Sequence, residues 1–483
     1  MRYFPGSIPP GPEFKPLLFA GIFPHAEAFS MLIFRSLHRL RWLLTAGFLA
    51  LVCQPASAQL TVKTLLRTTV PDADAADYQE VADAIRSFYS QDASGARSLL
   101  ETARQKSPEL AMVDVMLAQL YFSANQVSAG RQALENAVKE DSRDPLPYLI
   151  FGDLALQQRQ VTNARLIYEE GRRLAETFEG SPARKKTMTA QAANGLASVA
   201  EMREDWETAS QHLTTWIELE PENTASRIRM GRVLFKLGQI KESYSKFREA
   251  IGIDSQITRP EILMARLFDE NEESGKAKAL IGRAVERDGD SLKTRLAAAQ
   301  WYMQAGLYKE AKENAEAAQS INSNSVQALF LLGMVERFEM NHAAAEDAFM
   351  AAHLVEPSNA EVINQLALSL VEQTDDPRKQ QKALAWGQLA ARYNSDLKQV
   401  VARESMITVA WIMHRLGRVG ESLQAVQAAI NRGELRSEAN YFAARILHHN
   451  NRADLAKALL DRSLATTDLF PTRGDAEQLR DTL

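Results

Sequence analysis

Between residues 224 and 357, apolar and small residues recur with a period of 34 positions. Each period contains two segments in which apolar residues lie three to four positions apart, which is the spacing of an amphipathic helix. Three columns of small residues follow the same period: Gly231, Ala265, Ala299 and Gly333; Ser243, Ala277, Ala311 and Ala345; and Ala250, Ala284, Ala318 and Ala352. A fixed period of this length, built from two short helices, predicts an all-α solenoid of helix–turn–helix units.

The small columns have a steric explanation. Where the two helices of a hairpin cross closely, only a hydrogen atom or a methyl group fits between the backbones. Larger apolar residues are expected to fill the space around each crossing: Leu234, Phe247, Phe268, Ile281, Tyr302 and Phe349. The alternative, an alanine-rich helical bundle, would show helical periodicity but would not keep a 34-residue period through several units.

Extended in both directions, the register gives about eleven units. Their first small column is Ala84, Ala118, Gly152, Ala197, Gly231, Ala265, Ala299, Gly333, Ala367, Ala410 and Ala444. The step from Gly152 to Ala197 is 45 residues, and the step from Ala367 to Ala410 is 43. We therefore expect extra residues near 176–186 and 374–379, either as a longer helix or as surface loops.

The first 58 residues differ from the repeats. Residues 1–30 are rich in proline, whereas residues 31–58 combine a basic stretch, an apolar run and Ala56-Ser57-Ala58. This order is typical of an export signal cleaved before Gln59, and the apolar run is too short to span a bilayer. An uncleaved anchor is the alternative. Since the signal fits a start at Met31, residues 1–30 are interpreted as lying upstream of the native start or as disordered.

The remaining chain divides into a linker over 59–76, a repeat array over 77–470 and a C-terminal tail over 471–483. The one cysteine, Cys53, lies in the apolar run, so the exported chain is expected to fold without disulfides. After Ala58, 51 basic residues face 59 acidic residues. This balance disfavours a nucleic-acid partner, which would require a basic stripe.

At this point the chain resembles the tetratricopeptide repeat family. The unit that carries the resemblance best has Leu332-Gly333, Ala345, Phe349, Ala352 and Pro357 at the positions of the family pattern. Helix-ending prolines recur at Pro108, Pro221 and Pro357, and turn glycines at Gly238, Gly306 and Gly417. The resemblance covers about residues 77–470 and implies a groove lined by the first helix of each pair.

The resemblance further implies which side chains face this groove. The candidate partner-binding residues are Arg232, Phe235, Arg259, Arg266, Lys293, Phe330, Met334, Trp411 and Arg445. Guanidinium groups would bind carboxylates and aromatic rings would act as anchors, which suits an extended peptide or an acidic segment. The alternative is that these residues are solvated charges and inter-repeat packing.

No catalytic constellation, phosphate loop or metal motif is found in the sequence. We therefore expect no catalytic residue, no cofactor and no bound metal. The function expected is an exported, non-catalytic scaffold, periplasmic or secreted, that binds a protein or peptide in its groove. The alternative is a structural subunit of a cell-envelope assembly or polysaccharide-export complex, which some exported relatives form.

Overall fold

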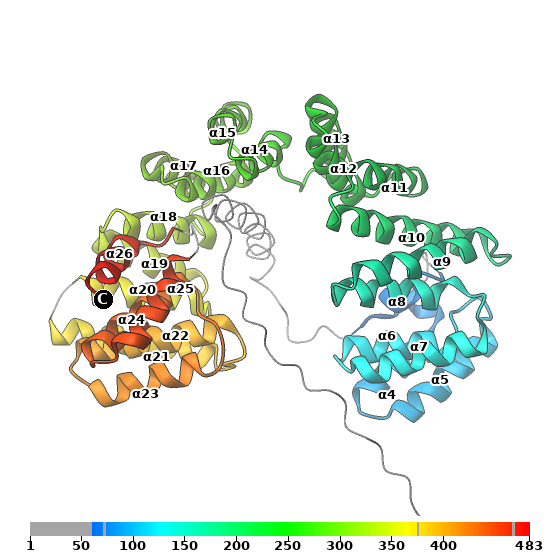
Figure 1. The fold of residues 1–483 in the computed structure, drawn as a ribbon, viewed down its shortest axis with the longest axis horizontal. Coiled ribbons are helices and arrows are strands. Elements are labelled where there is room, and N and C mark those ends of the chain that lie inside the picture. The colour runs from blue at the N-terminus through cyan, green and yellow to red at the C-terminus, as the bar shows by residue number, and fades with distance from the viewer. Residues whose placement is uncertain (1–59, 71–73, 374–375, 466–468) are drawn as a thin grey trace, which may run out of the picture. The chain divides into compact units, whose positions relative to one another are not determined.

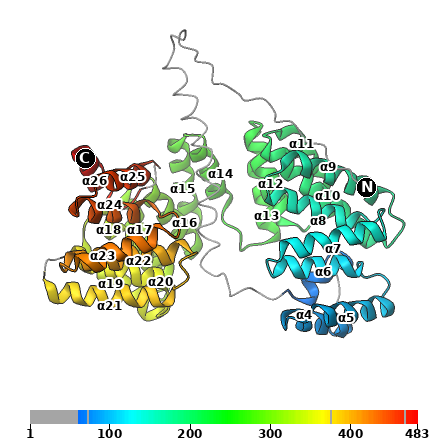
Figure 2. The same ribbon diagram turned by 60° about the horizontal axis from the view of Figure 1, so that its bottom comes forward.

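The computed structural model describes residues 60–70, 74–373, 376–465 and 469–483. The predicted export signal and residues 1–30 lie outside these ranges. The described residues form α-helices and no strand (Figures 1 and 2), and none of their helices combines the length and apolarity that a bilayer crossing needs. Taken in chain order, α4 to α25 give eleven helix pairs, which confirms the predicted all-α architecture of helix–turn–helix repeats.

The first helices of the pairs are α4 (Gln79–Tyr89), α6 (Val113–Ser123), α8 (Pro145–Gln157), α10 (Pro182–Met202), α12 (Thr224–Lys236), α14 (Pro260–Glu270), α16 (Leu292–Gln304), α18 (Val326–Phe338), α20 (Ala360–Glu372), α22 (Val400–Arg415) and α24 (Ser437–His449). The second helices are α5 (Ala93–Lys106), α7 (Val127–Glu140), α9 (Val161–Glu176), α11 (Trp206–Leu219), α13 (Ile240–Ile253), α15 (Ser274–Asp288), α17 (Tyr308–Ile321), α19 (His342–Val355), α21 (Pro377–Tyr393), α23 (Val419–Ile430) and α25 (Ala453–Leu464).

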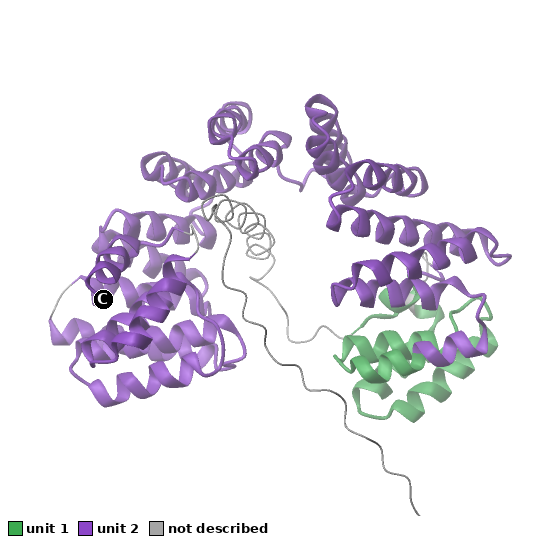
Figure 3. Ribbon diagram, viewed as in Figure 1, with its two compact units in different colours: residues 1–67, 72–133 green, residues 68–71, 134–483 purple. Residues whose placement is uncertain are grey.

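The chain divides into two compact units (Figure 3). The first comprises residues 1–67 and 72–133, and the second comprises residues 68–71 and 134–483. In the first unit, α3 (Val62–Leu66) buries Leu65 and Leu66, and the backbone N–H of Leu60 donates to the Tyr89 hydroxyl at 2.9 Å. Part of the segment expected as a linker is therefore a packed helix.

The small columns lie at the helix crossings, as predicted. A Cβ atom on Gly231 would lie 2.6 Å from the ring of Phe247, and one on Gly333 would lie 2.6 Å from the ring of Phe349. Ala265 and Ala299, which occupy the same column, are fully buried. Each crossing therefore combines one small residue with the large side chains around it.

The turns inside the hairpins contain a residue whose backbone is in the left-handed conformation. Gly238, Gly306 and Gly417 have φ values of 77°, 72° and 75°, which confirms the predicted glycine caps. The same place in seven other hairpins holds a residue other than glycine with positive φ: Gln91, Asn125, Arg159, Glu204, Glu272, Met340 and Asn451. A left-handed backbone costs such residues about 1–2 kcal/mol each.

Most first helices of the central repeats begin at the same place in the 34-residue period. α12, α16, α18 and α20 start at residues 224, 292, 326 and 360, each preceded by an Asn or Ser. The capping side chain accepts a backbone N–H in all four helices. Helix α14 is the exception: Ile257 stands in the capping place, and the helix begins at Pro260, two residues late. Arg259 before the proline is extended, with ψ of 143°, so α14 is short and offset from its neighbours.

The two longer steps in the register also have structural explanations. The 45-residue step is taken up mainly by α10, which has 21 residues and begins at Pro182. The 43-residue step contains α21 and α22, of 17 and 16 residues. Residues 471–483, expected as a tail, include α26 (Arg473–Thr482), which buries Ala476 against α24 and α25. The packed part of the chain therefore extends beyond residue 470.

Candidate partner-binding surfaces

Two predicted groove residues form a matched pair of cations on successive first helices. Arg232 on α12 is exposed and Arg266 on α14 is half-buried, and they lie 34 residues apart in the sequence. Neither guanidinium has an ion pair or hydrogen bond to another residue of the described ranges. Burial lowers the pKa of Arg266, although Glu270 opposes this shift. Both groups are therefore available to bind a carboxylate.

Two other predicted cations have partners within the chain. The Nζ of Lys293, at the start of α16, donates to the backbone carbonyl of Gln256 at 3.0 Å and so holds the loop before α14. The guanidinium of Arg259 contacts Glu261 at 3.5 Å and Asp288 at 4.0 Å. These contacts assign Lys293 and Arg259 a role in fixing the displaced start of α14.

The expectation that Phe235 and Trp411 are exposed anchors requires correction. The Phe235 side chain is 3% exposed and meets Phe268 of the next repeat edge-on, with ring centroids 4.9 Å apart. Trp411 is 1% exposed, and its indole N–H donates to Glu372 at 2.7 Å. Both rings are covered because large apolar side chains fill the space between successive repeats.

The three remaining candidates lie in the C-terminal half of the second unit. Phe330 packs edge-on against Phe349, and Met334 is partly buried against the same core. The guanidinium of Arg445 lies over the Trp411 ring at 4.8 Å, and its Nη1 donates to the Tyr441 hydroxyl at 2.9 Å. The structure therefore brings Trp411 and Arg445 together, but as packed neighbours within the chain.

The late start of α14 coincides with a cleft between α13 and α15. Its volume is about 960 Å³, and α14 contributes Pro260, Glu261, Met264 and Phe268 to its lining. The other lining residues are Ile240, Lys241, Tyr244, Arg248, Ile251 and Gly252 of α13, Ala279, Leu280, Lys276, Arg283 and Arg287 of α15, and Arg259. Six lining side chains are cationic and one is acidic, so the cleft has a strong excess of positive charge.

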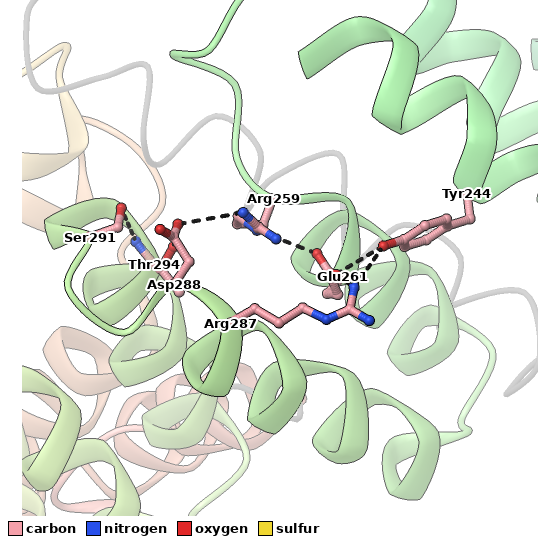
Figure 4. Close-up of polar contacts among 7 residues, drawn as sticks. All are labelled: Tyr244, Arg259, Glu261, Arg287, Asp288, Ser291 and Thr294. Atoms are coloured by element: carbon pink, nitrogen blue, oxygen red, sulfur yellow. Dashed lines mark hydrogen bonds and ion pairs between the residues drawn. The ribbon is translucent and has the colours of Figure 1, made fainter. Parts of the chain in front are cut away.

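The acidic residue, Glu261, is the centre of a polar network (Figure 4). Its side chain is 2% exposed, and its Oε1 accepts from the Tyr244 hydroxyl at 2.9 Å and from Arg287 Nη1 at 2.7 Å. Arg259 approaches the other oxygen, Oε2. This single carboxylate therefore joins α13, α14 and α15 at one end of the cleft.

The pKa of Glu261 reflects two opposing causes. Burial alone would raise the pKa of this carboxyl group, but its own backbone N–H, Tyr244, Arg259 and Arg287 together hold it below its usual value. The pKa of the Tyr244 hydroxyl is raised, because burial and the contact with Glu261 outweigh the lowering effect of Arg287. Glu261 is therefore held as an anion at neutral pH by its contacts within the fold.

Sequence reasoning from family positions named Arg259 but missed the other five cleft cations, because these lie on the second helices. A signal was nevertheless present: Lys241 and Arg248 are seven residues apart on α13, and Lys276 and Arg283 repeat that spacing on α15. Seven residues are close to two helical turns, so each pair lies on one face. No cluster of three or more metal-ligating side chains occurs in the described part of the chain.

Comparison with known proteins supports the repeat assignment. A tetratricopeptide repeat family model matches residues 88–174, and a second tetratricopeptide repeat model matches residues 415–472. No curated protein matches the chain. Among solved structures, yeast Tom70 is 14% identical with a TM-score of 0.38 and covers 85% of this chain and 96% of its own. YrrB, described as a tetratricopeptide repeat protein with an unusual peptide-binding site, is 18% identical with a TM-score of 0.28 and covers 42% and 97%.

A tetratricopeptide repeat protein of Parabacteroides merdae is 12% identical, with a TM-score of 0.34, and covers 60% of this chain and 97% of its own. The two family matches fall on α5–α9 and on α23–α25, near the beginning and the end of the series of helix pairs in chain order. Between them, the small-residue column keeps the 34-residue period from Ala197 to Ala367. The chain thus resembles tetratricopeptide repeats over residues 88–174 and 415–472, and its described helices form a solenoid of this type.

Proposed function

We propose that this protein is an exported, non-catalytic scaffold that binds a segment of another protein along its first helices α12 and α14. The observation that carries the proposal is the pair Arg232 and Arg266, which have no ion pair or hydrogen bond among the described residues and occupy one register position in successive repeats. Two guanidinium groups repeated in this way can each bind a carboxylate, and such hydrogen bonds between ionised groups are stronger than neutral ones. The proposed partner segment therefore carries at least two acidic side chains.

The export part of the proposal rests on residues 31–58, whose basic stretch, short apolar run and Ala56-Ser57-Ala58 follow the order of a cleaved signal. Sequencing of the N-terminus of the secreted or periplasmic protein tests it. Recovery of Gln59 as the first residue supports export with cleavage. A protein that stays in the cytoplasm with residues 31–58 intact would refute it.

Charge reversal tests the binding part. In Arg232→Glu/Arg266→Glu, each cation that attracts the partner becomes an anion that repels it, so we expect capture of the natural partner to fall about tenfold or more. The matched control is Lys309→Glu/Arg432→Glu, which reverses one exposed cation on α17 and one in the turn after α23. Circular dichroism and thermal unfolding verify that both variants fold.

Capture is measured by cross-linking the full chain in its native compartment, followed by mass spectrometry. Reduced capture by the first variant alone supports the proposal. Equal capture by the folded Arg232→Glu/Arg266→Glu variant and the wild type would contradict it. A set of envelope proteins cross-linked over the second helices would instead favour the alternative, a structural subunit of an envelope or polysaccharide-export assembly.

A further inference from the structure

We propose that the cleft between α13 and α15 is a second binding site, separate from Arg232 and Arg266, and that it binds an acidic amphipathic helix of a partner protein. The two surfaces lie on different faces of α14. Arg266 follows Met264 by two residues and precedes Phe268 by two, which places it about 160–200° around the helix from these cleft residues. A ligand can therefore occupy the cleft without touching Arg266.

The charge of the cleft selects an acidic ligand. Glu261 and Asp288 hold Arg259 and Arg287 in ion pairs, and Lys276 is paired with Glu273. The other three cations, Lys241, Arg248 and Arg283, are exposed and have no ion pair or hydrogen bond among the described residues. They stand on both α13 and α15, so a bound segment would meet positive charge on each side.

The apolar part of the lining selects a ligand that also has an apolar face. Met264 and Phe268 of α14 are buried, and Leu280 and Ile251 flank them half-exposed. Ile240 at the rim is 37% exposed. An apolar surface bordered by cations suits the apolar face of an amphipathic helix with acidic residues on its flanks. A nucleic acid would use the cations but leave this apolar surface without a partner.

The size and walls of the cleft favour a helix over an extended strand. The lining residues of α13 extend from Ile240 to Gly252, which is about 18 Å along a helix axis. That length fits a helix of about twelve residues. The walls are helices, whose backbone groups are already paired internally, so they offer no row of free N–H and C=O groups to an extended chain. A helical ligand pairs its own backbone N–H and C=O groups and does not need such a row.

Open space at the cleft surface supports an added ligand. A Cβ atom on Gly252 would meet no other atom within 4 Å, and Ala279 is exposed on the opposite wall. The N-terminal segment of this chain is a poor occupant on charge grounds, since residues 1–58 contain five basic and two acidic residues. The charge of the cleft therefore points to a different protein.

The test uses the full chain and a fluorescent peptide of about twelve residues, with leucines on one helical face and glutamates on its flanks. Fluorescence anisotropy measures its Kd at low and at physiological salt. We expect binding that weakens as salt rises, because part of the attraction is between exposed charges. Two matched probes are a scrambled peptide of the same composition and a single-stranded oligonucleotide of the same net charge.

Three variants locate the binding. Arg248→Glu/Arg283→Glu should weaken peptide binding about tenfold or more, because both walls of the cleft then repel the glutamates. Arg248→Lys/Arg283→Lys keeps the charge and should bind within a few-fold of wild type. Ala279→Trp fills the cleft from an exposed position and should block binding without loss of a core contact.

The Arg232→Glu/Arg266→Glu variant keeps this inference separate from the proposed function, because it should bind the peptide like wild type. Loss of binding in that variant would overturn the assignment of the peptide to the cleft. Failure of the wild type to prefer the amphipathic peptide to the scrambled one would overturn the proposed helix. Equal or tighter binding of the oligonucleotide, competed by the peptide, would replace a protein partner with a nucleic acid.

Discussion

The helices α12–α17 and the helices α18–α26 are built from the same repeat but differ in what their first helices contact. In the later group, α20, α22 and α24 pack on one another, and a single core extends from Leu329 to Ala476. In the earlier group, the first helices contact one another less, and the cores are separate and smaller. We call α18–α26, which share this continuous core, the closed region, and α12–α17 the open region. The same repeat pattern therefore produces both.

The cations illustrate the difference most clearly. Arg337 on α18 is fully buried, and its Nη2 donates at 2.8 Å to Glu438 on α24, which is 101 residues away in the sequence. Arg232 and Arg266 in the earlier helices have no such partner. Arg337 on α18 thus helps to hold the fold, whereas Arg232 on α12 and Arg266 on α14 are left available to a partner.

The largest expected effect comes from removing the buried ion pair between Arg337 and Glu438 in the closed region. In Arg337→Met, the carboxylate of Glu438, whose side chain is only 16% exposed, loses its partner. Leaving such a group unpaired costs about 3–5 kcal/mol. The measurement is urea unfolding followed by tryptophan fluorescence, because Trp411 lies in the same core.

Two controls sharpen this first prediction. Arg232→Met in the open region should change stability by less than about 0.5 kcal/mol, because a surface substitution without a partner is nearly neutral. Arg337→Met/Glu438→Leu should recover most of the loss, because neither charge then remains buried. A single Arg337→Met variant as stable as Arg232→Met would show that the closed region does not depend on this ion pair.

The second prediction compares two buried carboxyl groups with opposite pKa shifts. Burial raises the pKa of Glu404 on α22 to about 7, despite an ion pair with Arg436 at 2.9 Å. Between the unfolded pKa, about 4.3, and 7, the folded state binds more protons, so this group makes stability fall as pH rises. Glu404→Gln should therefore remove a loss of about 3–4 kcal/mol that is complete above pH 7.

Glu261 in the open region should behave in the opposite way. Its folded pKa is lowered, so it contributes stability above the unfolded pKa, and this contribution is lost as pH falls through the folded value. Glu261→Gln should thus destabilise the protein at neutral pH. Thermal unfolding of both variants from pH 2 to 8 tests the pair, and pH dependences of the same sign would contradict the assignment.

The third prediction tests what the two regions share. Gly231→Ala and Gly333→Ala each place a methyl group 2.6 Å from a phenylalanine ring, on α13 and α19 respectively. Overpacking of this kind costs about 1–3 kcal/mol. We expect similar losses from the two variants, measured by chemical denaturation, because the crossing is the same. A loss at one position only would mean that the crossings are not equivalent.

The smallest expected effects are at the hairpin turns. Glu272 in the open region and Met340 in the closed region have φ values of 62° and 61°. Substitution by glycine relieves left-handed strain but adds entropy to the unfolded chain, so a net gain of a few tenths to about 1 kcal/mol is expected at each. Gly238→Ala should lose about the same amount. Calorimetry on the three variants measures these differences.

The sequence predicted the features that depend on local spacing. The crossing of Gly231 with Phe247 and the turn at Gly238 follow from contacts within one hairpin, which the 34-residue period encodes directly. Trp216, which replaces a small residue in one column, packs into the core and donates its indole N–H to Glu220 at 2.8 Å. The larger side chain is thus accommodated, because Glu220, one helical turn further along the chain, accepts its N–H.

The features that the sequence did not predict depend on how repeats stack. Arg337 meets Glu438 only because the two repeats between them curve enough to bring α24 to α18, and no spacing rule encodes that curvature. Trp411 was assigned to the surface because its register position faces a groove, whereas neighbouring first helices cover it. The cleft accompanies the late start of α14, where Ile257 stands in the capping place and the helix begins at Pro260. Both residues are present in the sequence, but the repeat pattern does not show that the change in capping leaves a cleft.

The central claim is that a partner binds within residues 224–304 and that residues 326–482 stabilise the fold. The most direct test places a photo-crosslinking amino acid at Arg232, Ala279 or Arg445 in the full chain, one at a time, in the native compartment. The account predicts partner adducts at Arg232 and at Ala279 and none at Arg445. Partner adducts at Arg445 alone would show that the closed region binds the partner and would contradict the account.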